Sequence, residues 1–507
     1  MRGVLFKRTV FLLLVLMAIL IAGCGEEENQ TEMPTEGVTL WIVMEKNAAS
    51  GMREQAESVA RAFEADHPGV KVNLETLPES GQERENRLEQ LRTQIMNGSG
   101  PDGFLLPTTL WEWPATTPLQ IAWDGDRAVF TSATPQENPE SLFINLDMAM
   151  YSGLFADLSP YYDADTELHT EALQQTVMEA GVVGGARYVL PLRYEIPVIY
   201  ADAEQLAAQG LDTERMGKSL YAYWDVVLGT GQLPWMKGAL YQWGARHMQV
   251  LPVIYDYEGE QVILQKEALR TFLERYQQMR AAVGNHPLRD QTDFSVYWLT
   301  KAFLDEDVPL EPGNLDRAYT TAAIGASAEK PVVMLPLRSV EGETVARITY
   351  FAAAGAGTEH LELTYDFLRE FLTEEAQWQQ LRNSRPLSGE RLLAADGWPV
   401  RYNGSVEPLW NYVKQIKELE DKRSEALGST NPGHKRLLKL ELTDRDVPIL
   451  SVPIDRAYFD NDGLQALLDS ALQKLNDPER NRIPSDVDLD QLAEDILAEL
   501  EQYLAEG

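Results

Sequence analysis

The segment Val38-Thr39-Leu40-Trp41-Ile42-Val43 opens the folded part of the chain as a compact, β-rich apolar run. A run of this length and composition is expected for a strand that is buried on both faces. Apolar residues at helical spacing follow between Met52 and Phe63, and His67-Pro68-Gly69 ends that predicted helix. The chain therefore begins its fold with a strand and a covering helix.

The same alternation continues along the chain. Period-two alternation predicts a second strand over 70–74, and apolar spacing predicts a helix over 88–95 that ends at Gly98-Ser99-Gly100-Pro101. The apolar run at 104–106 predicts a third strand. Strand, helix, strand, helix, strand is typical of a parallel sheet with helices on its faces, so the predicted fold class is α/β.

The residues before this fold have the order of a bacterial lipoprotein signal. Basic residues at Arg2, Lys7 and Arg8 precede an apolar run over 10–22 and then Cys24. The run is shorter than the roughly 20 residues of a spanning helix. We therefore expect cleavage before Cys24, a lipid on that cysteine, an acidic tether up to residue 37, and a location on the extracytoplasmic face of the cell membrane. The alternative is an uncleaved anchor with a chance cysteine.

Composition limits the possible functions. Cys24 is the single cysteine of 507 residues, so no disulfide is expected, and the 44% of hydrophobic residues suffices for a core. The formal net charge of −35 disfavours binding to nucleic acid. This charge favours solubility and does not identify a ligand.

Motifs for catalysis are weak. Gly98 to Gly103 fits G-x-G-x-x-G, but it ends a helix and enters a strand, the reverse of a dinucleotide site. The six histidines occur singly, and Asp460-Asn461-Asp462-Gly463 is followed by an apolar helix start, which favours a helix cap over a calcium loop. We expect no metal, no cofactor and no enzyme. The 79 acidic residues still leave a carboxylate-pair glycosidase open.

Several segments resemble the extracellular solute-binding proteins of ABC importers, the family 1 group that contains maltose-binding protein. The amino-terminal signature consists of the opening strand, Phe63 to Val72 and the turn Asn97 to Asp102. The likeness continues at Leu154–Tyr162, Gly185–Leu192 and Phe367–Gln377, and it touches most of residues 38–400. The stretch 111–145 and the tail after 402 depart from the better known members.

The resemblance implies a two-lobed periplasmic-binding-protein-like fold (type II), with hinged lobes and parallel-rich mixed sheets. One lobe is expected over 38–192 plus 318–382, and the other over 193–317 plus 383–507. Strands are expected at 332–337 and 348–352. Helical spacing from Leu464 to Leu475 and from Leu489 to Leu504 predicts a helical C-terminal extension.

A sugar site needs flat apolar faces and polar groups, and open α/β sheets bind ligands at strand ends. Glu195 stands where the resemblance places a ligand-contacting glutamate, although it can instead pair with Arg193. Other candidates have structural alternatives, such as a solvated acid at Glu45, a turn cap at Asp102 and packing at Trp243 or Trp398. The full set of ligand-binding candidates is Glu45, Asp102, Thr108, Trp111, Trp113, Arg193, Tyr194, Glu195, Trp235, Trp243, Arg246, Arg338 and Trp398.

Taken together, these features predict a monomeric, lipid-anchored binding component of an ABC importer. It would capture an oligosaccharide or another small polar solute between closing lobes and deliver it to permease subunits, with ATP hydrolysed by a separate protein. A surface-anchored carbohydrate-active hydrolase and an adhesive lipoprotein are the alternatives. The sequence identifies neither the solute nor the permease, nor whether one or two membranes surround the cell.

Overall fold

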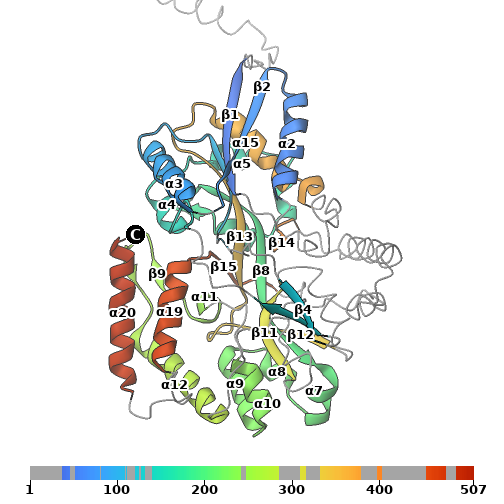
Figure 1. Cartoon of the computed structure of the whole chain (residues 1–507), viewed down its shortest axis with the longest axis vertical. Helices are drawn as coiled ribbons and strands as arrows, with labels where there is room; N and C mark the ends of the chain where they lie inside the picture. The colour runs from blue at the N-terminus through green and yellow to red at the C-terminus, as the bar shows by residue number, and fades with distance from the viewer. Residues whose placement is uncertain are drawn as a thin grey trace, which may run out of the picture.

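The structure is a computed structural model of the whole chain. It describes residues 37–45, 52–79, 81–108, 110, 120–124, 127–131, 140–240, 247–284, 309–315, 332–377, 397–401, 453–475 and 487–506. The described elements form an upper and a lower lobe along the long axis of the molecule, joined by strands that run between them (Figure 1).

The upper lobe starts with the predicted alternation. Its elements are β1 (Val38–Glu45), α2 (Met52–Asp66), β2 (Val70–Leu77), α3 (Gly81–Met96) and β3 (Gly103–Pro107). Strand β1 pairs in parallel with both β2 and β3, as the sequence predicts. Helix α2 ends at 67–69, where Gly69 adopts a φ of 95° that a residue with a side chain rarely takes.

Two long strands carry the sheet from one lobe to the other. Strand β8 (Val189–Asp202) is buried along its whole length, and it pairs antiparallel with β13 (Val345–Ala354). The sheet order is β11-β8-β13-β3-β1-β2, in which β13 is antiparallel to β3. The sheet is therefore mixed, and β1, β2 and β3 form a parallel part of it in the upper lobe.

Shorter strands complete this sheet at the lower end of β8 and beside β13. Strands β11 (Leu310–Leu315) and β12 (Val332–Pro336) pair with the second half of β8, and β14 (Trp398–Pro399) pairs with its middle. Strand β15 (Arg456–Phe459) pairs in parallel with β13. The strands predicted at 332–337 and 348–352 are confirmed.

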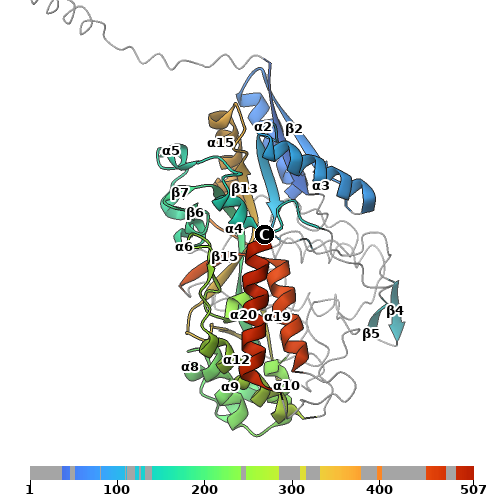
Figure 2. The same ribbon diagram turned by 90° about the vertical axis from the view of Figure 1, so that its left-hand side faces the viewer.

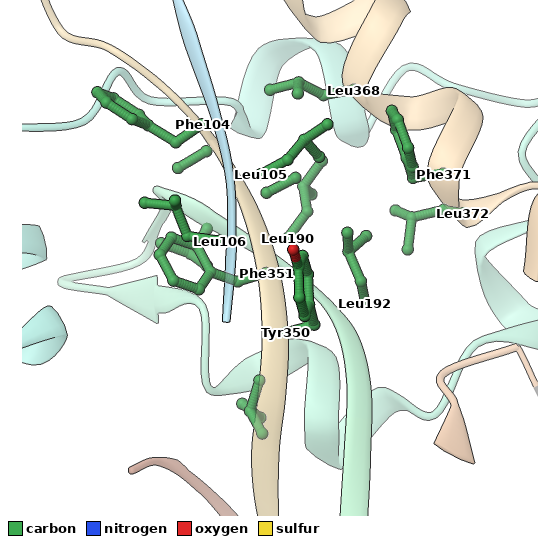
Figure 3. Close-up of a cluster of buried hydrophobic side chains, with 14 of the residues drawn as sticks. Phe104, Leu105, Leu106, Leu190, Leu192, Tyr350, Phe351, Leu368, Phe371 and Leu372 are labelled. Carbon is green, nitrogen blue, oxygen red and sulfur yellow. The ribbon is translucent and has the colours of Figure 1, made fainter. Parts of the chain in front are cut away.

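Each lobe has its own apolar core. The upper core gathers side chains from β3, β8 and β13 and from α15 (Leu361–Arg369), and Figure 3 shows Leu106, Leu190 and Phe351 among them. The lower core is built around Trp224, Trp235 and Phe272. Strand β8 contributes to both, because alternate side chains near its end face opposite cores.

The remaining described elements are short or belong to the lower lobe. They are β4 (Gln120–Asp124), β5 (Arg127–Thr131), α4 (Leu146–Tyr151), α5 (Ser159–Tyr162), η1 (Thr170–Ala172), α6 (Gln175–Glu179), β6 (Val182–Val183), β7 (Ala186–Arg187), α7 (Ala203–Gln209), α8 (Thr213–Met216), α9 (Leu220–Gly229), α10 (Leu233–Leu240), α11 (His247–Val250), β9 (Tyr255–Asp256), β10 (Gln261–Val262), α12 (Lys266–Val283) and η2 (Glu370–Leu372).

The end of the chain is helical, as predicted. Helices α19 (Asp462–Lys474) and α20 (Leu489–Glu506) lie side by side in both views and bury their leucines in the lower core (Figure 2). Asn461 caps α19, since its side-chain oxygen accepts a hydrogen bond from the Leu464 amide at 3.0 Å. Within the described residues, no helix has the length and apolar character needed to cross a membrane.

Candidate functional site

The carboxyl end of β3 is fastened to the crossing strand β13. Thr108, directly after β3, donates its backbone N–H to Thr349 O at 3.1 Å and its hydroxyl to Ile348 O at 2.7 Å. The register between β13 and β8 shifts at this point, which is the signature of a β-bulge around Thr349. The edge where an open α/β sheet binds ligands therefore meets the strands that join the lobes.

Glu195 lies at this junction, and an arginine of β13 binds its carboxylate. Arg347 stands opposite Glu195 in the sheet, and its Nε and Nη2 lie 2.5 Å from Glu195 Oε1. The Nη1 of Arg347 donates to Asp460, which follows β15. All three side chains are buried. Glu195, Arg347 and Asp460, named here the junction triad, thus connect β8, β13 and the start of the C-terminal helices.

The electrostatics of the junction triad favour the charged form of Arg347. Burial alone would lower the pKa of Arg347, but the charges of Glu195 and Asp460 outweigh this effect and the pKa lies above its ordinary value. The arginine thus stays protonated while it compensates two buried carboxylates. Such an arrangement is strongly destabilised when a single partner is removed.

Glu195 therefore pairs with Arg347, whereas the sequence suggested Arg193 as the partner. Arg193 is buried separately and donates from Nη2 to Gln377 O at 3.0 Å. Burial lowers the pKa of Arg193 to about 9. The Glu195 carboxylate is thus bound across the antiparallel strands by a residue of β13.

Trp398 and Tyr194 lie next to each other across β14 and β8. Both side chains are buried in the upper core. In this structure Trp398 therefore has a packing role, which was the alternative to ligand stacking. The preceding Gly397 has a φ of 103°, and a Cβ there would lie 2.5 Å from the Thr349 hydroxyl and 2.8 Å from Tyr194 O. Because glycine has no side chain, the segment before β14 can pack directly against the bulge of β13.

Glu45, at the end of β1, is also bound by an arginine. Its two carboxylate oxygens accept from Arg84 Nη1 at 2.9 Å and from Nη2 at 2.7 Å, and only 5% of the Glu45 side chain and 3% of the Arg84 side chain are exposed. Arg84 also donates to Pro78 O and Glu140 O. Burial raises the pKa of Glu45, and Arg84 offsets part of that rise. The structural alternative for Glu45 was a solvated acid, and the structure shows a buried ion pair instead.

Three other candidates lie away from the junction. Asp102 stands at the opposite end of β3 from Thr108, where its carboxylate accepts from Trp41 N at 2.8 Å and from the Thr358 hydroxyl at 2.5 Å, as a turn cap does. Arg338 donates to Gly342 O at 2.8 Å within a turn. Trp235 is 1% exposed in the lower core, so its surroundings favour packing over ligand stacking.

The structure thus brings together five of the predicted ligand-binding residues, from three separate stretches of the chain. They are Thr108, Arg193, Tyr194, Glu195 and Trp398. Glu45 lies at the same edge of the sheet, one strand further along. The other candidates, which are Cys24, Trp111, Trp113, Trp243 and Arg246, lie outside the described residues.

Sequence reasoning missed Arg84 and Arg347, which bind the predicted acids Glu45 and Glu195, and it took Asp460 for part of a helix cap. Arg347 carried a usable signal, since it is the one charged residue within the apolar run from Val345 to Ala354. A charge within a fully buried strand requires an opposite charge nearby. No group of three histidine, cysteine or acidic side chains able to hold a metal is found in the described part of the chain.

Comparison with known proteins adds the class of fold. No protein-family model and no curated protein sequence matches the chain. Solved structures match over nearly the whole length. A periplasmic oligogalacturonide-binding protein from Yersinia enterocolitica has a TM-score of 0.52 at 15% identity, over 92% of this chain and 99% of its own. The cyclic α-maltosyl-1,6-maltose binding protein of Arthrobacter globiformis has a TM-score of 0.51 at 12% identity, over 93% and 100%.

The chain therefore has a two-lobed α/β fold with strands crossing between the lobes. More specifically, it is the fold of the extracellular solute-binding proteins, which confirms the predicted fold class. A de novo designed esterase is similar too, with a TM-score of 0.51 at 14% identity over 93% of this chain and 99% of its own. At such identities the likeness concerns the fold, so neither sugar binding nor ester hydrolysis passes to this chain from it.

Proposed function

We propose that this protein is the solute-binding component of an ABC importer. It captures an oligosaccharide or another small polar solute between its lobes and delivers it to permease subunits. The observation that carries the proposal is the construction of the molecule from two separate cores connected by β8 and β13. Such an architecture allows hinge closure around a ligand. The solute-binding fold supports the same function.

The location and lobe limits belong to this proposal. A lipid on Cys24 holds the protein on the extracytoplasmic face of the membrane, as a monomer. One lobe takes 38–192 plus 318–382, and the other takes 193–317 plus 383–507.

The state of the described acids favours binding over hydrolysis. A glycosidase of the common type needs two carboxyl groups facing the scissile bond, one of them a proton donor. Arg84 and Arg347 bind the carboxylates of Glu45 and Glu195, respectively. Both oxygens of the Glu45 carboxylate and Oε1 of Glu195 are bound by buried guanidinium groups, which suits a structural role.

A ligand screen tests the proposal. The full chain, solubilised in detergent, is followed by thermal melting and tryptophan fluorescence against oligosaccharides, amino acids, peptides and polyamines, and each hit is checked for breakdown products. A ligand at 100 times its Kd stabilises the folded protein by about 2.7 kcal/mol. An intact ligand that raises Tm supports the importer. Cleaved product indicates the hydrolase, and the absence of any Tm change over the whole panel contradicts solute binding.

Matched variants connect that screen to the predicted site. Trp111→Ala and Trp113→Ala should each weaken binding, because a sugar face stacked on an aromatic ring loses its contact area. Met96→Ala, which alters an 80% exposed side chain on α3, should leave the affinity unchanged. Unchanged affinity in both tryptophan variants would show that these two residues do not contact the ligand. The importer proposal would still be tested by the ligand screen.

A further inference from the structure

The lobes touch at a second place besides the crossing strands, through helix α4. Three residues of this helix belong to the upper core, namely Leu146, Ala149 and Met150. Met148, on another side of the helix, packs against the lower core instead. The Tyr151 ring stacks on Tyr257 of the lower lobe, with centroids 5.9 Å apart and an interplanar angle of 25°. Helix α4 therefore belongs to one lobe and rests on the other.

The contact continues into the lower lobe as a row of tyrosines. The Tyr257 ring lies 5.5 Å from that of Tyr255, whose hydroxyl donates to Leu500 O of α20 at 2.7 Å. Both views place the C-terminal end of α20 beside α4 (Figures 1 and 2). A rotation of the lobes about β8 and β13 must move Tyr151 relative to Tyr257.

Asp147 and Tyr151 are four residues apart on α4, so the Asp147 carboxyl group lies on the same side of the helix as the ring that meets Tyr257. Asp147 is partly buried, and desolvation by the surrounding protein raises its pKa to about 7, while the Tyr257 hydroxyl offsets part of the rise. Among the described residues, the groups that act on the cluster are acids and phenols, with one amide. They are Asn145 and Tyr151 beside Asp147 on or before α4, Tyr255, Asp256, Tyr257 and Glu258 on the facing turn, and Tyr503 on α20. The charges of Asp147, Asp256 and Glu258 all act on Tyr151, whereas the rise in the pKa of Asp147 itself comes from desolvation.

We propose that the contact of α4 with Tyr257 is a proton-sensitive latch between the lobes, closed in the arrangement described here while Asp147 is protonated and weakened when Asp147 ionises. That the lobes move at all rests on the proposed function. Moving them apart admits water to the carboxyl group, and water stabilises its ionised form far better than the aromatic contact does.

The sign of the pH effect follows from linkage. A carboxyl group whose pKa is raised in the contact binds its proton more tightly there than in water, so acid favours the latched state. The stability of the latched state falls as the pH rises from the ordinary aspartate pKa of 3.8 to about 7. Above that pH its stability no longer changes. One unit of pKa difference corresponds to a tenfold change, so the difference between 3.8 and about 7 changes the equilibrium on the order of 1000-fold.

An inter-lobe distance measures the latch directly. The full chain, with Cys24 replaced by serine, receives spin labels at Met96→Cys of α3 and Glu214→Cys of α8, both highly exposed. Pulsed electron paramagnetic resonance is recorded without any solute at pH 4.5 and pH 8.5. We expect one distance at pH 4.5 and a second, different distance to become populated at pH 8.5.

Two variants and a control identify the titrating group. Asp147→Asn should keep the pH 4.5 distance at both pH values, while Asp163→Asn, which changes an exposed acid of the same lobe, should respond like its parent. Tyr257→Phe keeps the ring stack but removes the hydroxyl that favours the carboxylate, so its transition should move to higher pH. This second variant remains decisive if Asp147→Asn does not fold.

The latch is refuted if the parent distance does not respond to pH, or if Asp147→Asn responds as the parent does. An unmoved transition in Tyr257→Phe would also contradict it. Because no solute is present, these outcomes are separate from those of the ligand screen. A protein that shows the latch and binds nothing in the panel would contradict solute capture alone.

Discussion

The Glu45 carboxylate and the Arg84 guanidinium are joined by two parallel hydrogen bonds, Oε2 to Nη1 at 2.9 Å and Oε1 to Nη2 at 2.7 Å. These bonds connect the last residue of β1 to the first turn of α3. We expect Arg84→Met to lower the free energy of unfolding by about 3–5 kcal/mol, because it leaves a buried carboxylate without its partner. Chemical denaturation at pH 7, followed by tryptophan fluorescence, measures this loss.

The same variant should be sensitive to pH. Burial already raises the pKa of Glu45, and removal of Arg84 takes away the offset. The folded state then binds the Glu45 proton more tightly than the unfolded state, so stability should fall as the pH rises from 4.5. The double variant Glu45→Met with Arg84→Met should recover much of the loss and show no such fall. A double variant as unstable as Arg84→Met would mean that packing, not charge, is responsible.

Arg347 should matter more than a surface arginine. Arg347→Met leaves the buried Glu195 and Asp460 carboxylates without their arginine. We expect the free energy of unfolding to fall by at least about 3–5 kcal/mol. Arg53→Ala removes an exposed pair with Glu57, which should cost no more than about 0.5 kcal/mol. Urea midpoints of the two variants are compared at pH 7. Equal midpoints would show that the junction triad contributes little.

Gly397 offers a test of the junction through the backbone. Gly397→Ala should destabilise the protein, because the new Cβ meets the Thr349 hydroxyl and Tyr194 O and the φ of 103° is strained for alanine. Gly229→Ala, near the end of α9, places its Cβ where nothing lies within 4 Å, so it should be neutral or slightly stabilising. The difference in Tm between the two variants is the measurement. A larger loss in Gly229→Ala would contradict the described geometry.

The docking of the last helix depends on a buried hydroxyl. Tyr255→Phe removes the donor to Leu500 O and should cost about 0.5–1.5 kcal/mol. Hydrogen exchange, which reports local opening, should accelerate in α20 more than in α2. Equal acceleration in both helices would show that the hydroxyl does not specifically hold α20.

Lipid attachment has a direct assay. We expect the full chain to incorporate labelled fatty acid in a bacterial host and to sediment with membranes, and Cys24→Ser to do neither. Arg53→Ala, which preserves the cysteine and changes only an exposed ion pair, serves as a control for expression. Membrane association of Cys24→Ser would instead indicate the uncleaved anchor.

The opening alternation could be predicted because each element is local. The run from Val38 to Val43, the helix stop at 67–69 and the leucine spacing of the tail are set by period and turn chemistry within a few residues, and the structure confirms the strands and helices there. The order of the strands in the sheet was harder to predict from the sequence. The insertion of β13 between β3 and β8 depends on pairing between residues far apart in the chain.

The candidate site was harder to predict for the same reason. The sequence selected Glu195 and Glu45, but their partners Arg347 and Arg84 lie 152 and 39 residues away. Arg193, two residues from Glu195, was the nearest visible cation. Which arginine reaches which acid depends on strand register, and register is fixed only when the whole sheet forms.

The burial of β8 along its whole length also sets the order in which the molecule can assemble. Its neighbours β11, β12, β13 and β14 all follow it in the chain, and β13 ends at Ala354. Until a growing chain has passed that residue, β3 and β8 lack the strand that lies between them in the sheet. Sheets that depend on such distant pairings fold slowly. Slow folding would keep the chain unfolded for longer, which suits the export across the membrane that the proposed location requires.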